Sequence, residues 1–230
     1  MGADDAQDLR EALKRVAVAL KQSGMPFALM GGYAAWARGG PEPDHDVDFL
    51  VAAEDADDIA QFLADQDLDV VQPPEDWLFK VYADGAMVDI IHGPVGTPAD
   101  RAEVERATLM EVLSVEMPVL EATEVVIHKL GSLDEHYCDI SKVLPVLRAL
   151  REQVDWERVE RETAGSDFAA AVLFLVRRLG IVEGVAPGVR SRLSAGEPRL
   201  RRPSSMLTEA PRRRGVGATM EVRTTPPPLG

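Results

Sequence analysis

Hydrophobic residues recur with two different periods along the chain, and the period changes near residue 122. Before that point, short apolar runs bounded by glycine, proline or aspartate predict β-strands, interspersed with a few amphipathic helices. After it, a repeat of 3.6 residues continues to about residue 179 and predicts helices alone. This distribution indicates an α+β fold that ends in a helical part.

The individual elements follow from the same pattern and from proline and glycine as breaks. Strands are expected over residues 27–30, 46–51, 70–71, 77–82 and 87–91. Helices are expected over residues 8–22, 33–38, 55–65, 123–137, 140–147, 154–161 and 168–179. Residues 102–113 fit a helix or a helix–strand join. Residues 115–120 contain Pro118, which cannot donate to a neighbouring strand, so they are expected as an edge strand or a non-strand segment.

Two aspartates one residue apart, Asp46 and Asp48, begin the second strand. In an extended chain, residues i and i+2 point to the same face, so the two carboxylates lie side by side. Such carboxylates repel each other or share a proton unless a cation lies between them. Oxygen ligands of this kind suit Mg²⁺, which takes its remaining ligands from water and substrate phosphates. The glycine pair Gly31-Gly32 lies upstream and would let backbone N–H groups approach a phosphate closely.

A third acid, Asp89, stands alone in an otherwise apolar strand, where a charge is costly unless it faces a partner or a metal. Asp84-Gly85 between two apolar runs predicts a hairpin that carries this strand. If the hairpin pairs beside the strand of Asp46 and Asp48, three carboxylates converge on one patch of sheet. That arrangement can hold two divalent ions for in-line attack on a nucleotide α-phosphate.

This order of an apolar strand, a Gly-Gly pair, an Asp-x-Asp strand and a later lone aspartate resembles the DNA polymerase beta-like nucleotidyltransferase superfamily. The resemblance covers roughly residues 5–182 and is closest to AbiEii-like toxin and aminoglycoside nucleotidyltransferases. It implies a mixed sheet flanked by helices, two Mg²⁺ ions on Asp46, Asp48 and Asp89, and a triphosphate against Gly31 and Gly32. Many members carry serine at the second position of the glycine pair, so one hydroxyl contact to the phosphate is missing here.

The helical part contains two further candidates for nucleotide binding. Lys129 lies near the apolar stripe of its helix, from which its side chain can extend and bring a positive charge to a triphosphate. Asp139 follows ten residues later. Resemblance to AbiEii-like proteins implies that Lys129 contacts the triphosphate and that Asp139 orients the nucleotide or the acceptor. The alternatives are a surface lysine and an aspartate that caps a helix.

Composition divides the chain into three parts. The expected domains are a catalytic domain over residues 1–121, a helical subdomain over 122–183 and a tail over 184–230 that is rich in proline and arginine and is predicted to be disordered. The tail holds nine Arg and three Glu, giving +6, so a net charge of −14 leaves −20 on the preceding residues. Residues 1–183 are so acidic that they repel nucleic acid in general. An RNA substrate would therefore have to bind a local basic patch or the tail.

The same composition bears on location. A single cysteine, Cys138, excludes an internal disulfide and favours a reducing compartment. No apolar run is long enough to cross a membrane, and the acidic N-terminus lacks the apolar core of a secretion signal. A cytoplasmic protein is therefore expected.

These features together predict an enzyme that transfers a nucleoside monophosphate from a nucleoside triphosphate to an acceptor hydroxyl. One possible acceptor is tRNA or protein, as for a toxin with a cognate antitoxin or in phage defence. The other is a small molecule such as an aminoglycoside, which an acidic groove would attract. A non-catalytic module that keeps the fold and binds a partner is the alternative of a different class.

Overall fold

The computed structural model of the chain describes residues 3–43, 45–83 and 85–182. In this part, seven strands form one sheet in the order β3-β4-β5-β2-β1-β7-β6. Their bounds are β1 Phe27–Met30, β2 Val47–Val51, β3 Asp69–Val71, β4 Leu78–Ala83, β5 Ala86–Ile91, β6 Thr108–Val112 and β7 Val115–Val119. The sheet is mixed, because β2 is parallel to β5 and β1 is parallel to β7, whereas the other neighbours are antiparallel.

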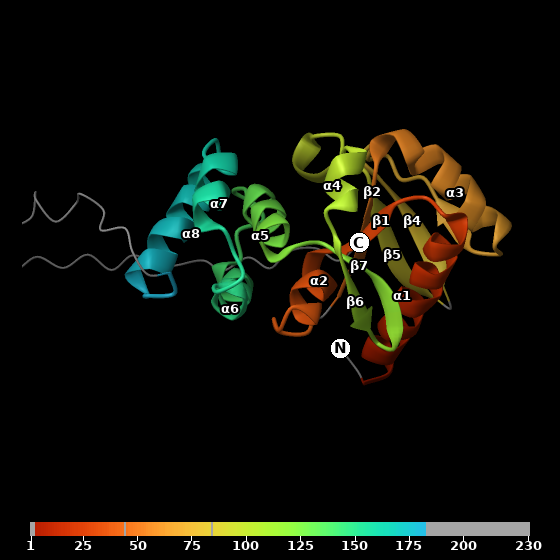
Figure 1. The fold of residues 1–230 in the computed structure, drawn as a ribbon, viewed down its shortest axis with the longest axis horizontal. Helices are drawn as coiled ribbons and strands as arrows, with labels where there is room; N and C mark the ends of the chain where they lie inside the picture. Colours follow the sequence, from red (N-terminus) through yellow and green to blue (C-terminus); the bar gives the residue numbers. More distant parts are fainter. Residues whose placement is uncertain (1–2, 44, 84, 183–230) are drawn as a thin grey trace, which may run out of the picture. The chain divides into compact units, whose positions relative to one another are not determined.

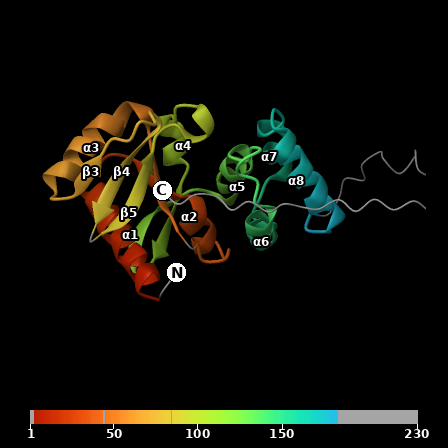
Figure 2. The same cartoon turned by 180° about the vertical axis from the view of Figure 1, so that it is seen from behind.

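Helices flank this sheet (Figures 1 and 2). The helix α1 packs on β4, β5 and β7 and against α3, whereas α2 and α4 contact β1 and β2. The helices α5 to α8 follow the last strand and pack on one another, and α5 also contacts α2. The bounds are α1 Ala3–Ser23, α2 Gly31–Ala37, α3 Ala56–Asp65, α4 Arg101–Glu105, α5 Ala122–Gly131, α6 Ile140–Leu150, α7 Trp156–Glu162 and α8 Asp167–Arg178, with 3₁₀ turns η1 Ala53–Asp55 and η2 Pro94–Gly96.

The central strands show why the sequence folds in this way. In β2, Val47 and Phe49 are almost fully buried on one face, and Asp48 lies on the other face between them. In β5, Val88 and Ile90 are buried in the same manner around Asp89. One face of the sheet is therefore apolar throughout its centre, while the acidic residues project from the opposite face.

The α+β fold with a mixed sheet and a helical C-terminal part is confirmed, and most predicted elements are present within a few residues. The hairpin is also present: β4 and β5 pair up to Ala83 and Ala86, and Gly85 has a left-handed φ of +86°. Asp84 and the tail over residues 184–230 lie outside the described residues. The domain boundary predicted after residue 121 falls between β7 and α5, and it stays a prediction.

One prediction about the strands was wrong, and one open alternative is decided by the structure. The segment with Pro118 is not an edge strand, because β7 pairs with both β6 and β1. Its pairing with β1 is limited to Leu29 and Val119, one residue beyond the proline, so no donor is needed at Pro118 on that side. Residues 102–113 divide into α4 and β6, the second of the two possibilities.

The first helix of the C-terminal part is shorter than predicted. It ends at Gly131, so Leu133 lies beyond it, and Tyr137 is 76% exposed instead of packed. The helix α6 contains Pro145 in its interior and continues to Leu150. None of the described helices combines the length and apolar character needed to cross a bilayer.

Candidate active site

The backbone pairing places four side chains in a row across the acidic face of the sheet. Asp48 in β2 is in register with Asp89 in β5, and Asp89 is in register with Lys80 in β4. On the other side, Asp48 is in register with Met30, the last residue of β1. Residues in register on neighbouring strands project to the same face, so Lys80, Asp89 and Asp48 lie next to one another.

A cavity of about 720 Å³ opens at the end of this row, where β1 ends and β2 begins. Among the predicted site residues, Gly31, Gly32, Asp46, Asp48 and Lys129 line it. The same cavity is lined by Glu42, Lys142 and apolar side chains that include Trp77, Val95 and Val146. Five of the seven residues predicted for the site therefore border one cavity.

The glycine pair is required by packing at this point. Gly31 has a φ of +63°, and a Cβ on it would overlap the Oδ2 atom of Asp48. A Cβ on Gly32 would lie 2.6 Å from the Cβ of Pro43. The two glycines thus leave room for the Asp48 carboxyl group and for Pro43 in the segment between α2 and β2, a reason that differs from close approach to a phosphate.

Electrostatic repulsion is concentrated on Asp48. Burial and, after it, the nearby charges of Asp46 and Asp89 raise the pKa of its carboxyl group to about 7, while Lys129 and Lys80 act in the opposite direction. Carboxylates that repel one another in a cavity are the donor set that a divalent cation would stabilise. The residues present at Asp46 and Asp48 therefore fit a hard cation such as Mg²⁺.

Asp89 is close to this cluster but already has a partner. The Nζ atom of Lys80 lies 2.8 Å from the Oδ1 atom of Asp89 and forms an ion pair with it. The side chains of Lys80 and Asp89 are only 25% and 17% exposed. Unlike Asp46 and Asp48, Asp89 is not among the residues that line the cavity.

Two lysines face the carboxylates from the helical part. Lys129 in α5 is near enough to Asp48 to influence its pKa, and burial lowers the pKa of the Lys129 ammonium, against the opposing effect of Asp48. Lys142 in the first turn of α6 lies close enough to lower the pKa of Lys129 further. The prediction included Lys129 but not Lys142. Both side chains border the cavity and could contact an anionic ligand there.

Asp139 lies elsewhere. Its carboxylate caps α6 by accepting hydrogen bonds from the backbone N–H of Ser141, at 3.0 Å, and of Lys142, at 3.4 Å. It also accepts one from the Ser141 hydroxyl group. Asp139 is exposed and does not line the cavity, so its contacts are those of the capping alternative. A role in orienting the nucleotide stays a prediction.

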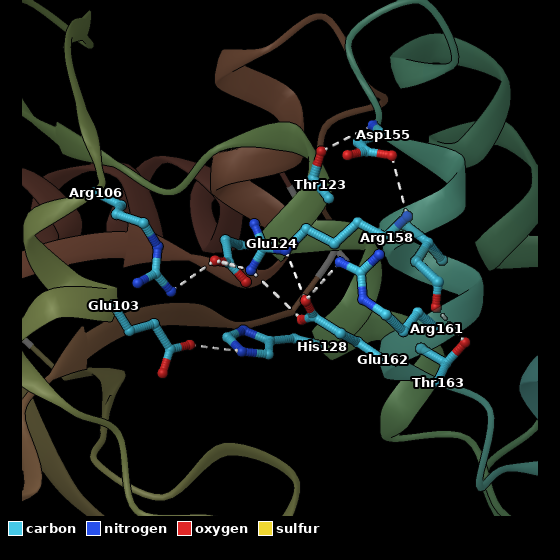
Figure 3. A network of polar contacts seen from close by, with 11 residues as sticks. Glu103, Arg106, Thr123, Glu124, His128, Asp155, Arg158, Arg161, Glu162 and Thr163 are labelled. Carbon is cyan, nitrogen blue, oxygen red and sulfur yellow. Dashed lines mark hydrogen bonds and ion pairs between the residues drawn. The ribbon is translucent and has the colours of Figure 1, made fainter.

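A polar network that the sequence did not predict holds the other face of α5 (Figure 3). Glu124 is 3% exposed and binds two guanidinium groups, that of Arg106 at 2.9 Å and that of Arg158 at 2.6 Å. Next to it, the Nε2 atom of His128 lies 2.9 Å from the Oε1 atom of Glu103. A buried glutamate in an apolar helix was the one visible signal, but its partners are distant in sequence.

Carboxylates of Glu103 and Glu124 and a ring nitrogen of His128 approach within 4.8 Å of one another, as the ligands of a metal ion would. However, Glu124 is already neutralised by two guanidinium groups, which would repel a cation. The aspartates at the cavity are the better donor set.

Solved structures with a similar fold include several nucleotidyltransferases. They include ANT(2″)-Ia in complex with adenylyl-2″-tobramycin (15% identity, 70% of this chain and 97% of that chain, TM-score 0.49). They also include LnuA, a lincosamide antibiotic adenylyltransferase bound to lincomycin (13% identity, 59% and 94%, TM-score 0.43). A Thermotoga maritima protein described as a nucleotidyltransferase shares 20% identity over 48% of this chain and 75% of that chain, with a TM-score of 0.39.

At these identities and TM-scores, the structural likeness carries no argument about activity. No curated protein matches the chain. A family model described as "uncharacterised nucleotidyltransferase" matches residues 2–190, which include all the described strands and helices. The chain therefore belongs to this family of nucleotidyltransferases.

Proposed function

We propose that the chain is a Mg²⁺-dependent enzyme that transfers a nucleoside monophosphate from a nucleoside triphosphate to an acceptor hydroxyl group. The observation that carries the proposal is the placement of Asp46 and Asp48 on a cavity, with Asp89 in register beside Asp48. Membership of a nucleotidyltransferase family supports the reaction class. The raised pKa of Asp48 supports a bound cation, because a divalent ion would offset both the burial and the repulsion that disfavour its ionised carboxylate.

In this proposal the triphosphate lies between the glycine pair and the two lysines. The helix α2 begins at Gly31, and the Met30 side chain at its N-cap position makes no capping hydrogen bond in the described structure. Its first N–H groups could therefore bind phosphate oxygens. Lys129 and Lys142 would neutralise the phosphate charge from the opposite wall. A bound Mg²⁺ on Asp46 and Asp48 would supply charge neutralisation at the reacting phosphate and lower the pKa of the acceptor hydroxyl group.

The reaction balances as a simple displacement. The acceptor oxygen forms a bond to the α-phosphorus, and the bond from this phosphorus to the bridging oxygen of the β-phosphate breaks, releasing pyrophosphate. The proton of the acceptor hydroxyl group needs a base near the α-phosphate. Asp89 is the carboxylate beside Asp48 that can take it, since its Oδ2 atom is not the one bound to Lys80.

The charges along the cavity favour a macromolecular acceptor over a polycationic antibiotic. Its lining contains Glu42, Asp46 and Asp48 but also Lys129 and Lys142, so the two signs nearly balance. Moreover, Glu42 is engaged by the Arg10 guanidinium in two hydrogen bonds of 2.7 Å. An aminoglycoside would find few unpaired carboxylates there. We therefore favour tRNA or protein as acceptor, as for an AbiEii-like toxin with a cognate antitoxin, and keep aminoglycosides as the second candidate.

The proposal is tested by offering acceptors to the purified chain with each of the four α-³²P-labelled nucleoside triphosphates and Mg²⁺. Total cell RNA, a protein lysate and an aminoglycoside panel are incubated in parallel. Label in RNA or protein supports the favoured acceptors, and label in the antibiotic fraction supports the second candidate.

Calorimetry with Mg²⁺ and each triphosphate distinguishes an enzyme without its acceptor from a non-catalytic module. Binding without transfer means that the acceptor has not been offered. Absence of Mg²⁺-dependent triphosphate binding would contradict the proposed function and favour a partner-binding module.

A further inference from the structure

The Lys80–Asp89 pair is unusual for a carboxylate that would serve a metal site. Asp89 lies in the sheet between Asp48 on β2 and Lys80 on β4, and both are in register with it. Neighbouring strands are about 4.8 Å apart, so the ammonium group and the Asp48 carboxyl group approach Asp89 from its two sides. The observed distance of 2.8 Å means that one of the two Asp89 oxygens is occupied by a resident cation.

The backbone keeps Lys80 at this position. The β4–β5 hairpin is continuously paired from Leu78 and Ile91 to Ala83 and Ala86. A one-residue slip of this register would turn every side chain of β4 to the other face, so the strand pairing fixes the lysine opposite Asp89. Three-quarters of the Lys80 side chain is buried, which restricts its ammonium group further.

The local charges then leave room for one divalent ion. Three carboxylates, Asp46, Asp48 and Asp89, lie near two ammonium groups, those of Lys80 and Lys129. One Mg²⁺ converts this net charge from −1 to +1, whereas two would make it +3 before any phosphate binds. The two carboxylates on the cavity, Asp46 and Asp48, are also those without a resident cation among the contacts of the described residues.

We propose that Lys80 takes the place of a second metal ion: its ammonium group neutralises Asp89, and the site binds a single divalent cation on Asp46 and Asp48. This inference rests on the proposed function and replaces the two ions that the family resemblance implies. Lys80 acts here as a positioning residue, because it holds the Asp89 carboxylate and does not itself contact the substrate. Removal of its charge should open Asp89 to a second ion.

The number of bound ions tests this directly. Free Mn²⁺ is followed by electron paramagnetic resonance as it is titrated, without nucleotide, into the full chain and into Lys80→Met, which keeps the length of the side chain but removes its charge. We expect one ion per chain in the wild type and two in Lys80→Met. Lys80→Arg keeps a positive charge and should bind one ion.

Two further variants control for fold and for unspecific binding. Lys14→Met removes another lysine that pairs with a carboxylate, that of Glu11 at 2.6 Å, and should leave the count at one. Asp48→Asn should remove the specific ion, and a thermal melt of each variant verifies that it is folded. Two ions in the wild type, or an unchanged count in folded Lys80→Met, would overturn the inference but leave the proposed function intact. A wild type that binds no ion without nucleotide would also overturn the inference, whereas the proposed function is decided separately by Mg²⁺-dependent binding of the triphosphate.

Discussion

At the scale of single residues, the left-handed backbone of Gly31 and the carboxyl group of Asp48 depend on each other. Asp48 occupies the space in which any other residue at position 31 would hold its Cβ. The φ of +63° is also one that residues with a Cβ adopt only at a cost. The sheet therefore presents Asp48 to the cavity because the chain has no side chain at position 31.

A Gly31→Ala substitution separates backbone strain from displacement of the carboxyl group. We expect both a loss of stability of at least about 1 kcal/mol and a loss of transfer activity of about 10²-fold, because small displacements of catalytic groups are costly. Gly24→Ala is the matched control: Gly24 has a φ of +72°, and its Cβ would meet no atom of the described structure within 4 Å. It should lose stability in urea denaturation but keep its activity. Equal activity in both variants would contradict this interpretation.

The pKa of Asp48 predicts a dependence of stability on pH. Its folded pKa of about 7 is raised above the usual value of 3.8, so the folded state binds the proton more tightly than the unfolded state. The stabilisation linked to this proton is present below pH 4 and is lost as the pH rises from about 4 to 7. Asn at position 48 has no such proton. The free energy of unfolding of Asp48→Asn, minus that of the wild type, should therefore increase over this range.

Urea denaturation in EDTA from pH 4 to pH 8 measures this difference, and the contributions of other acids cancel between the two proteins. A difference that stays flat across the range would show that Asp48 is ionised throughout. Addition of Mg²⁺ should reduce the slope of the wild type, because the cation stabilises the carboxylate.

The sequence predicted Asp46 and Asp48 because a strand has a period of two. It predicted Asp89 because a charge in an apolar strand is costly unless it faces a partner or a metal. The Lys80–Asp89 pair was equally accessible but was not predicted. The pairing of Ala83 with Ala86 sets the hairpin register and places residue 80 opposite residue 89. The proximity of Lys142 could not be obtained in this way, because it depends on how α6 packs beside α5.

At the scale of elements, α5 joins the sheet to the helical part. One side of the helix presents Lys129 to the cavity, and the other side carries Glu124. Glu124 binds Arg106, which follows α4, and Arg158, which lies in α7. Burial acts to raise the pKa of the Glu124 carboxyl group, but the two guanidinium groups together outweigh it and lower the pKa. Its ion pairs therefore set the position from which Lys129 reaches the site.

Glu124→Gln removes the charge and keeps the shape. We expect a loss of about 1.5–3 kcal/mol of stability, since both hydrogen bonds involve charged groups in a buried place. We also expect an increase in the KM for the triphosphate, because α5 carries Lys129. Glu162→Gln is the control: Glu162 pairs with Arg158 at 2.8 Å from a position that is 37% exposed, and its loss should cost less than about 1 kcal/mol. Chemical denaturation and steady-state kinetics measure both effects. Similar losses in the two variants would show that buried Glu124 contributes no more than the more exposed Glu162.

At the scale of the whole molecule, the fold could be predicted from the sequence much further than the site. The periods of the strands and helices predicted the α+β class. The glycine pair, Asp46 and Asp48 were predicted and line the cavity, and Asp89 was predicted and lies beside Asp48. The place of β7 inside the sheet could not be predicted, because Pro118 argues locally against an inner strand. The polar network around Glu124 joins residues from 103 to 162, and no local pattern reveals it.

The central claim is that Asp48 and its neighbours support Mg²⁺-dependent nucleotidyl transfer. It is tested most directly by comparing the wild type, Asp48→Asn and Asp58→Asn for transfer of α-³²P label to cell RNA or protein. Asp58 is an exposed aspartate of α3 and serves as the matched control. The account predicts transfer by the wild type and Asp58→Asn that stops in EDTA, and a decrease of more than about 10²-fold in Asp48→Asn. Label transfer by a folded Asp48→Asn variant at nearly the wild-type rate would contradict it.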